Sequence, residues 1–134
     1  MQFGSINGLE KKISKLILGN DKQKKYNSAV KLWDYFYENG GNVFDNSIYY
    51  RNGESEKFLG KWIKSRNIEK NIVIISKVGE ESSHPSEISR LLQISLERLN
   101  SNTVDILILH HHNKQVPISE YVDALNEIKF SGKI

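Results

Sequence analysis

The sequence lacks cysteine altogether, and it contains no long run of apolar residues. The absence of cysteine excludes a disulfide scaffold and thiol-based catalysis, and it is typical of proteins in a reducing cytoplasm. No window approaches the length of a membrane-spanning helix, and the apolar residues near the N-terminus are scattered among lysines, unlike those of a signal peptide. The composition therefore predicts a soluble, cytoplasmic protein that does not associate with a membrane.

Two further signals are missing, and each excludes a class of ligand. No GxGxxG or GxxxxGK[ST] motif is present, so the sequence lacks the glycine-rich loop with which nucleotide-binding open sheets hold phosphate. The formal net charge is +3, but the lysines of the N-terminal stretch have no interleaved aromatic residues and form no basic stripe at helical spacing. We interpret them as a solvated face and predict no nucleic-acid partner.

A repeat of strand and helix patterns fills the chain. Its 134 residues are 38% hydrophobic and 26% charged, which predicts one globular domain over residues 1–134. Apolar runs typical of strands occupy 16–18, 42–44, 72–75 and 104–109, and each is followed by a helical pattern. The stripes expected to face the core include Ala29, Leu32, Trp33 and Phe36 in the first helix and Val122, Leu125 and Ile128 in the last.

Units of this kind, each of roughly thirty residues, form parallel strands joined by right-handed crossovers. They fit either an open doubly wound sheet or a (β/α) barrel. Because no phosphate-binding loop follows any strand, the barrel is favoured. The predicted fold class is α/β, a TIM (β/α)8-type barrel of which only the first four βα units are present as a half-barrel. Asn7-Gly8 predicts a hairpin turn, so an N-terminal β-hairpin is expected before the first unit.

Polar residues stand where the predicted strands end. Gly19, Asp45, Lys77 and His110 each follow an apolar run, and Tyr50 lies on the loop after Asp45. Taken alone, Asp45 would be a turn or helix-capping residue and Tyr50 a packing residue. The carboxyl ends of barrel strands open onto one face, however, and barrel enzymes hold their catalytic groups there. We therefore predict that these side chains converge in an active site.

The residue types indicate proton transfer coupled to hydride transfer. A free tyrosine has a pKa of about 10, and a neighbouring cation, which Lys77 would supply, favours the phenolate. Asp45 would keep the ammonium charged and oriented. His110 could donate a hydrogen bond to a substrate oxygen or share the proton relay. The set fits protonation of a carbonyl oxygen while hydride reaches its carbon, and hydride transfer implies a nicotinamide cofactor.

The same segments resemble the aldo-keto reductase family over nearly the whole chain. The resemblance rests on four stretches in the family's order and spacing: KISKLILGN, NVFDNSIYYRNGESEKFLGKWIKSR, NIVIISKVG and SLERLNSNTVDILILHHH. It implies an oxidoreductase that moves a hydride between NADP(H) and a small-molecule carbonyl or alcohol substrate. Tyr50 would be the general acid, with Lys77, Asp45 and His110 as its partners.

The family's spacing selects Tyr50 over Tyr49 and His110 over the two histidines that follow it. The resemblance also implies that the backbone at Gly19 and Asn20 runs alongside the cofactor, and that Asp45 lies beside it. The segment departs from the usual FDTA and tyrosine-glycine patterns, because this chain has FDNS at 44–47 and Tyr50-Arg51. These are substitutions near the site that it can tolerate.

Three consecutive histidines also suggest a metal site. On a strand only His110 and His112 would share a side, and two ligands without a nearby carboxylate or cysteine make a poor zinc site. We therefore predict no metal.

Length sets this chain apart from the family it resembles. Family members are eight-stranded barrels of roughly twice this size or more, and the sequence stops where a fifth strand would begin. We expect a truncated form with its catalytic residues intact, whose activity needs a complementing C-terminal half-barrel. Two alternatives stay open: two copies pair as a homodimer, or the half-barrel is a non-catalytic binding or scaffold module. In each case the first and fourth strands would have open edges beside an apolar interior face.

Overall fold

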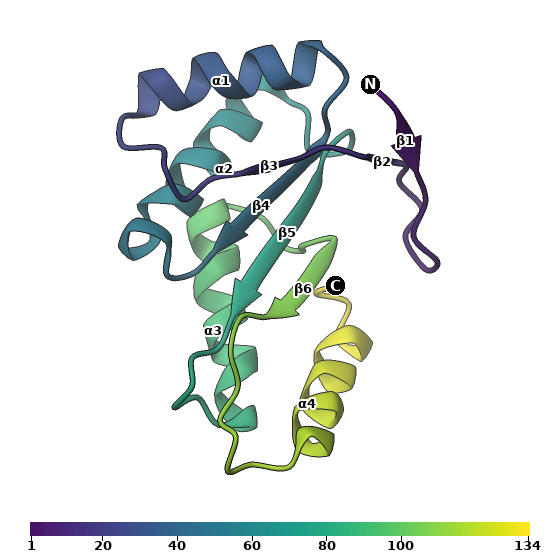
Figure 1. The fold of residues 1–134 in the computed structure, drawn as a ribbon, viewed down its shortest axis with the longest axis vertical. Helices are drawn as coiled ribbons and strands as arrows, with labels where there is room; N and C mark the ends of the chain where they lie inside the picture. Colours follow the sequence, from purple (N-terminus) through teal and green to yellow (C-terminus); the bar gives the residue numbers. More distant parts are fainter.

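The computed structural model describes residues 1–134 as a four-stranded parallel sheet with helices between its strands and a hairpin ahead of it (Figure 1). The strands lie side by side in the order β3 (Ile17–Gly19), β4 (Val43–Ser47), β5 (Val73–Val78) and β6 (Ile106–Leu109). The helices that follow them in turn are α1 (Tyr26–Glu38), α2 (Glu54–Arg66), α3 (Pro85–Leu99) and α4 (Ile118–Phe130). A short 3-10 turn, η1 (Tyr50–Gly53), precedes α2.

The order of the strands decides between the two architectures that the sequence allows. Neighbours in the sheet are also neighbours along the chain, and all three pairings are parallel. An open doubly wound sheet reverses its strand order at a switch point, whereas a barrel continues in one direction. The prediction of an α/β partial barrel is therefore confirmed.

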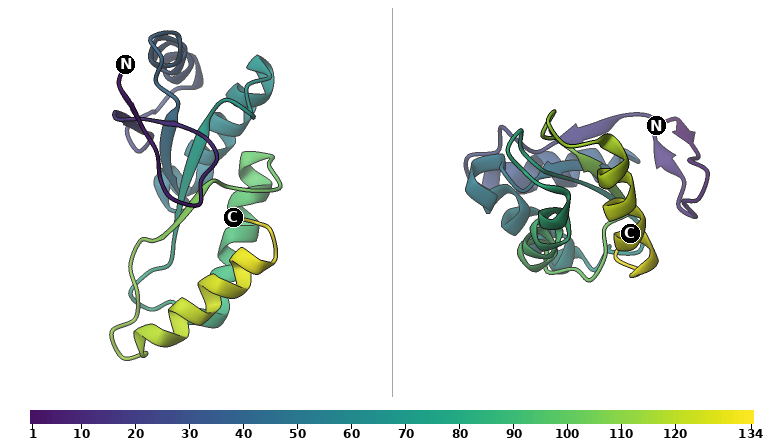
Figure 2. Two further views of the ribbon diagram at one scale, coloured as in Figure 1. Left: turned by 90° about the vertical axis from the view of Figure 1, so that its right-hand side faces the viewer. Right: turned by 90° about the horizontal axis from the view of Figure 1, so that it is seen from below.

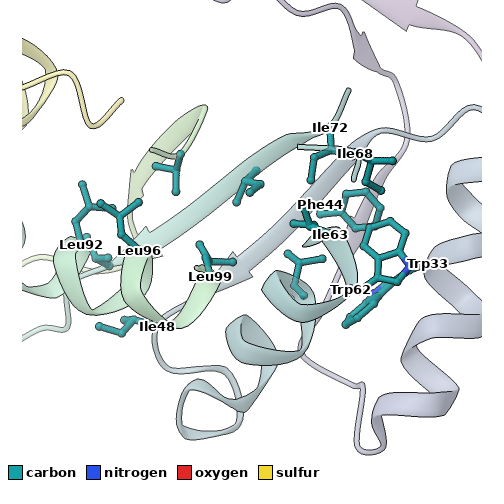
Figure 3. Close-up of a cluster of buried hydrophobic side chains, with 14 of the residues drawn as sticks. Trp33, Phe44, Ile48, Trp62, Ile63, Ile68, Ile72, Leu92, Leu96 and Leu99 are labelled. Carbon is teal, nitrogen blue, oxygen red and sulfur yellow. The ribbon is translucent and has the colours of Figure 1, made fainter. Parts of the chain in front are cut away.

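The core that supports the sheet is centred on three aromatic residues from successive elements. Trp33 of α1 and Trp62 of α2 lie with their ring centres 5.6 Å apart, and Phe44 of β4 lies 5.1 Å from Trp62 (Figure 3). All three side chains are fully buried. Aromatic pairs in this range add to the stability that their buried area provides. This cluster fixes β4, and hence the acid it carries, against two helices.

Two residues predicted to face the core are exposed instead. Leu32 of α1 is 38% exposed and Val122 of α4 is 50% exposed. In α4 the buried residues are Ile128, as predicted, and Tyr121. The Tyr121 hydroxyl donates to the Ser83 carbonyl at 2.6 Å and accepts from the Asn113 amide at 3.0 Å. The apolar pattern of α4 does not reveal this stripe, because the anchor of the helix is a tyrosine with polar partners.

The N-terminal hairpin lies at the amino ends of the parallel strands (Figures 1 and 2). Its strands β1 (Phe3–Gly4) and β2 (Ile13–Ser14) pair antiparallel, which confirms the hairpin, although its loop is wider than a two-residue turn. The Ser14 amide donates to the Asn42 side chain at 2.7 Å, and Lys11 pairs with Asp105 at 2.7 Å. These contacts leave the carboxyl ends of the strands free.

The sheet has open edges at β3 and β6, as the sequence predicts. Ile17 of β3 is 52% exposed and Ile108 of β6 is 41% exposed. Both lie on the face opposite the helices, since Ile17 is in register with Val43 and Ile108 with Lys77. None of the helices combines the length and the apolar character needed to cross a bilayer.

Candidate active site

The strands that carry the predicted acid and lysine are longer than the sequence indicates. β4 continues through Asp45 to Ser47, and β5 continues through Lys77 to Val78. The prediction that Gly19, Asp45 and Lys77 follow their strands is therefore wrong, because parallel pairing includes Gly19 opposite Asp45 and extends through Ser47 opposite Lys77. All three residues still lie at the carboxyl ends of the sheet, and His110 follows β6 directly, as predicted.

The Lys77 ammonium joins three of the four predicted catalytic residues. Its Nζ lies 2.9 Å from Oδ2 of Asp45 and 2.6 Å from the hydroxyl oxygen of Tyr50. The side chains of Lys77 and Asp45 are 16% and 25% exposed, so solvent screens this pair only in part. An ammonium group can only donate, and the Tyr50 oxygen therefore accepts from it. The phenol proton remains available to an acceptor outside the cluster.

The surroundings of Lys77 keep it charged. Desolvation by burial lowers the pKa of Lys77, but hydrogen bonds to Tyr50 and Asp45 outweigh this effect and raise the pKa above its ordinary 10.5. A lysine in this state is a fixed positive charge at neutral pH. That charge lies beside the Tyr50 oxygen, 2.6 Å away, where negative charge develops if the phenol gives up its proton.

His110 completes the set from the neighbouring strand. Its ring lies edge-to-face with that of Tyr50, with ring centres 6.0 Å apart, and its Nδ1 lies 3.2 Å from Oγ of Ser47. Burial lowers the pKa of His110, as do the charges of Lys77 and His111, while Asp45 opposes the shift in part. The imidazole is therefore neutral in the neutral pH range, a state in which one nitrogen donates and the other accepts.

This pKa shift predicts how stability changes with pH. Between the lowered folded pKa of His110 and its ordinary 6.5, the unfolded chain binds more protons than the folded chain, so stability rises with pH in this window. The contribution is complete above 6.5 and is lost as the pH falls through the folded pKa. We expect urea denaturation to show this rise in the wild type and its absence in His110→Gln. Parallel pH curves for the two proteins would contradict the lowered pKa.

A buried ion pair holds the turn that carries Tyr50. Arg51, Asn52 and Gly53 have φ values of 52°, 55° and 87°, a conformation that is uncommon for residues other than glycine. Arg98 of α3 donates to the Ile48 carbonyl at 2.9 Å, and a Cβ atom at Gly53 would lie 2.3 Å from its Cζ. The guanidinium thus packs against the turn and fixes both sides of Tyr50.

Glu56 of α2 is the partner of this arginine. Its side chain is fully buried, and its Oε2 lies 3.3 Å from Nη1 of Arg98. Burial raises the pKa of Glu56, and the hydrogen bond and charge of Arg98 counteract the shift in part. The sequence does not identify this pair, because no local pattern links two residues that lie 42 positions apart.

Ser47 is a second residue that sequence reasoning passed over. It is fully buried and lies two residues after Asp45 on the same strand. Strand alternation places residues i and i+2 on one face, so the spacing from Asp45 was a usable signal.

Of the residues predicted to bind a cofactor, Gly19 is open to a ligand and Asn20 is not. Gly19 is in register with Asp45, and a Cβ atom added to it would meet only Asp21, at 4.0 Å. Its backbone is open to a ligand. Asn20 is fully buried: its side chain accepts from the Trp33 indole at 2.7 Å and donates to the Asp45 carbonyl at 3.2 Å. Asn20 therefore orients the loop, and cofactor binding at these positions stays a prediction.

The three histidines do not follow strand alternation. β6 ends at Leu109, and the ring of His111 stacks on that of His110, with centres 4.9 Å apart. His112 instead packs edge-to-face against Tyr121 at 6.0 Å. The expectation that His110 and His112 share a side assumes a strand, and the strand ends at Leu109, before the histidines.

Comparison with known proteins agrees with this arrangement. The model of the family described as "Aldo/keto reductase family" matches residues 15–134. Norsolorinic acid reductase B of Dothistroma septosporum is 32% identical over 123 residues, which cover 80% of this chain and 31% of that protein.

Solved structures show the same fold. An aldo-keto reductase from Bacillus halodurans in its holo form superposes with a TM-score of 0.87 and 27% identity, covering 100% of this chain and 48% of that one. An aldo-keto reductase from Klebsiella pneumoniae in complex with NADPH superposes with a TM-score of 0.81 and 24% identity over 92% of this chain and 44% of that one. The chain thus spans about a third of the curated relative's length and about half that of the solved structures.

Proposed function

Because this chain belongs to the aldo/keto reductase family, we propose that its site moves a hydride between NADP(H) and the carbonyl or alcohol group of a small molecule. One observation carries the proposal: a single ammonium, on Lys77, donates to Tyr50 at 2.6 Å and to Asp45 at 2.9 Å. This geometry leaves a phenol proton directed away from a fixed cation. Such a proton donor suits a carbonyl oxygen that gains negative charge during reduction.

The chain's own residues supply the proton and the charge stabilisation. In reduction, the Tyr50 O–H bond breaks, its proton forms the new O–H bond of the alcohol, and the bonding electron pair remains on the phenolate oxygen beside Lys77. Asp45 holds Lys77 in place, and His110 donates a second hydrogen bond to the same substrate oxygen. When bound, NADPH supplies the hydride that the carbonyl carbon receives. Alcohol oxidation reverses these proton steps.

The cofactor would lie over the ends of β3 and β4. Gly19 offers open backbone next to Asp45, and Asn20 holds that loop through Trp33. These residues fit a flat ring placed at the strand ends, because no side chain projects from Gly19. The choice of NADP(H) is supported by the Klebsiella pneumoniae relative, which is in complex with NADPH.

We also propose that a second body of βα units completes this half-barrel. The edges at β3 and β6 are open, and the exposed Ile17 and Ile108 lie on the face opposite the helices. Relatives of the same fold contain about as much chain again. A complementing C-terminal half-barrel would pair both edges and cover this face, and pairing of two copies is the other outcome to be tested.

Fluorescence titration with NADPH tests the cofactor proposal. The 134-residue chain is measured alone and after mixing with the part of the Bacillus halodurans relative that it does not match, and its mass in solution is determined in both samples. Saturable binding in the mixture, with a mass equal to one copy of each, supports a complementing half. If the chain alone binds NADPH and has twice its own mass in solution, a second copy, not a C-terminal half-barrel, completes the site. No binding in either sample would contradict NADP(H) as cofactor and favour a binding or scaffold module.

A further inference from the structure

We propose that Ser47 is a positioning residue, whose hydroxyl donates to Nδ1 of His110 and so holds the imidazole in the tautomer that carries its proton on Nε2. The inference rests on the proposed function, because it concerns the nitrogen of His110 that faces a substrate. It gives a role to a buried serine that takes no part in the proton transfer from Tyr50.

The contacts of Ser47 bring it to His110 from a rigid part of the fold. Ser47 is fully buried at the end of β4, in register with Lys77 of β5. Its Oγ lies 3.2 Å from Nδ1 of His110 and accepts from the Tyr49 amide, 3.3 Å away. The same hydroxyl is also placed to donate to the carbonyl oxygen of Lys77, 3.2 Å away. Ser47 thus touches the strands that hold the lysine and the histidine.

The hydroxyl has one proton for two acceptors of equal distance. The carbonyl of Lys77 is already paired, because it accepts from the Ile48 amide at 3.1 Å. Nδ1 of His110 has Ser47 as its hydrogen-bond partner. When Ser47 donates to Nδ1, the Lys77 carbonyl keeps its bond from the Ile48 amide. When Ser47 donates to the carbonyl instead, Nδ1 carries the histidine's own proton and donates it to the Ser47 oxygen. We propose the first arrangement because the carbonyl is already paired and Nδ1 has no other partner.

The choice of acceptor decides what His110 offers to a substrate. A neutral imidazole has one N–H group. With Ser47 donating to Nδ1, that group is Nε2–H, a donor for a carbonyl oxygen. In the other tautomer Nε2 is a bare lone pair that repels the same oxygen. Burial and the charge of Lys77 keep His110 neutral, by lowering its pKa, so the tautomer is a real choice above pH 6.5.

Nitrogen NMR of the histidine-labelled chain reads the tautomer without any cofactor. Above pH 6.5, we expect the ring signals of wild-type His110 to show an unprotonated Nδ1 and a protonated Nε2, with assignment by their loss in His110→Gln. Ser47→Ala should give a mixture of tautomers, and Ser47→Thr, which keeps the hydroxyl, should restore the wild-type pattern. Ser76→Ala is the matched control, since Ser76 is equally buried on the next strand and its hydroxyl has no partner. Protonated Nδ1 in the wild type, or an unchanged pattern in Ser47→Ala, would overturn the proposal.

Kinetics separate this inference from the proposed function. If the site reduces carbonyls, Ser47→Ala should lower kcat by roughly tenfold, the effect of one hydrogen bond in the transition state, with little change in KM. A wild-type protein that shows the expected tautomer but no hydride transfer would contradict the function and leave the Ser47 assignment standing. Full activity in a protein whose His110 carries its proton on Nδ1 would support the function and contradict the Ser47 assignment.

Discussion

Tyr50→Phe should lower the rate of carbonyl reduction by about 10²–10⁴-fold, the usual contribution of a general acid, while NADPH binding stays unchanged. The variant removes only the hydroxyl that lies 2.6 Å from Lys77. In the variant, Lys77 still pairs with Asp45. The substrate oxygen, however, has no proton donor next to it as its negative charge develops. Single-turnover rates and a cofactor titration on the same preparations measure the two quantities separately.

Tyr49→Phe is the matched control for this experiment. Tyr49 is the preceding residue, and its ring stacks on His110 with centres 6.2 Å apart. Burial raises the pKa of Tyr49, partly offset by a hydrogen bond with Ser83, which makes it a poor proton donor. We expect its loss to change the rate only a few-fold. A larger loss in Tyr49→Phe than in Tyr50→Phe would show that the general acid is misassigned.

Arg98→Met should destabilise the fold by about 3 kcal/mol, the cost of leaving a buried charge without its partner. Glu56 has no exposed surface, and Arg98 is its ion-pair partner at 3.3 Å. The value lies at the low end for such pairs because Glu56, whose pKa burial already raises, can become neutral by binding a proton. The turn at Tyr50 loses its anchor in the same variant, so activity should fall as well. Urea denaturation measures the change in the free energy of unfolding.

Two comparisons identify the cause of this loss. Arg90→Met removes an arginine from the same helix, where its pair with Glu87 is long, at 3.5 Å, and exposed, so the change should stay within about 0.5 kcal/mol. Glu56→Gln combined with Arg98→Met removes both charges and should recover most of the stability. An equal loss in Arg90→Met, or no recovery in the double variant, would show that the buried pair is not responsible.

The site was predictable where it depends on local pattern and on the rule for parallel strands. Lys77 and His110 follow β-branched or leucine-rich runs, and the rule that carboxyl ends meet on one face brings them together with Asp45. The limits of β4 were not predictable, because Asp45 and Ser47 have the composition of a turn although they lie on a paired strand. Local pattern indicates which secondary structure a segment favours. Here the pairing with β5 determined where β4 ends.

Contacts between distant segments were out of reach for the same reason. Glu56 and Arg98 are 42 residues apart, and Ser47 and His110 are 63 residues apart. Neither contact is visible in the hydrophobic period of the sequence, since each depends on the packing of two elements across the fold. The buried carboxylate of Glu56 would be read from sequence as one more charge on the exposed side of α2. Only its complete burial distinguishes it.

The most direct test of these assignments is a single-turnover experiment with NADPH and benzaldehyde as a small carbonyl probe. The 134-residue chain is used alone and together with the complementing part of its Bacillus halodurans relative, and the absorbance of the reduced nicotinamide is followed. We expect NADPH to be oxidised in the mixture and this oxidation to be almost completely lost when Tyr50→Phe replaces the wild type. NADPH that binds to the wild-type mixture but stays reduced, or is oxidised equally fast by Tyr50→Phe, would contradict the assignment of Tyr50 and Lys77 as the proton-donating pair.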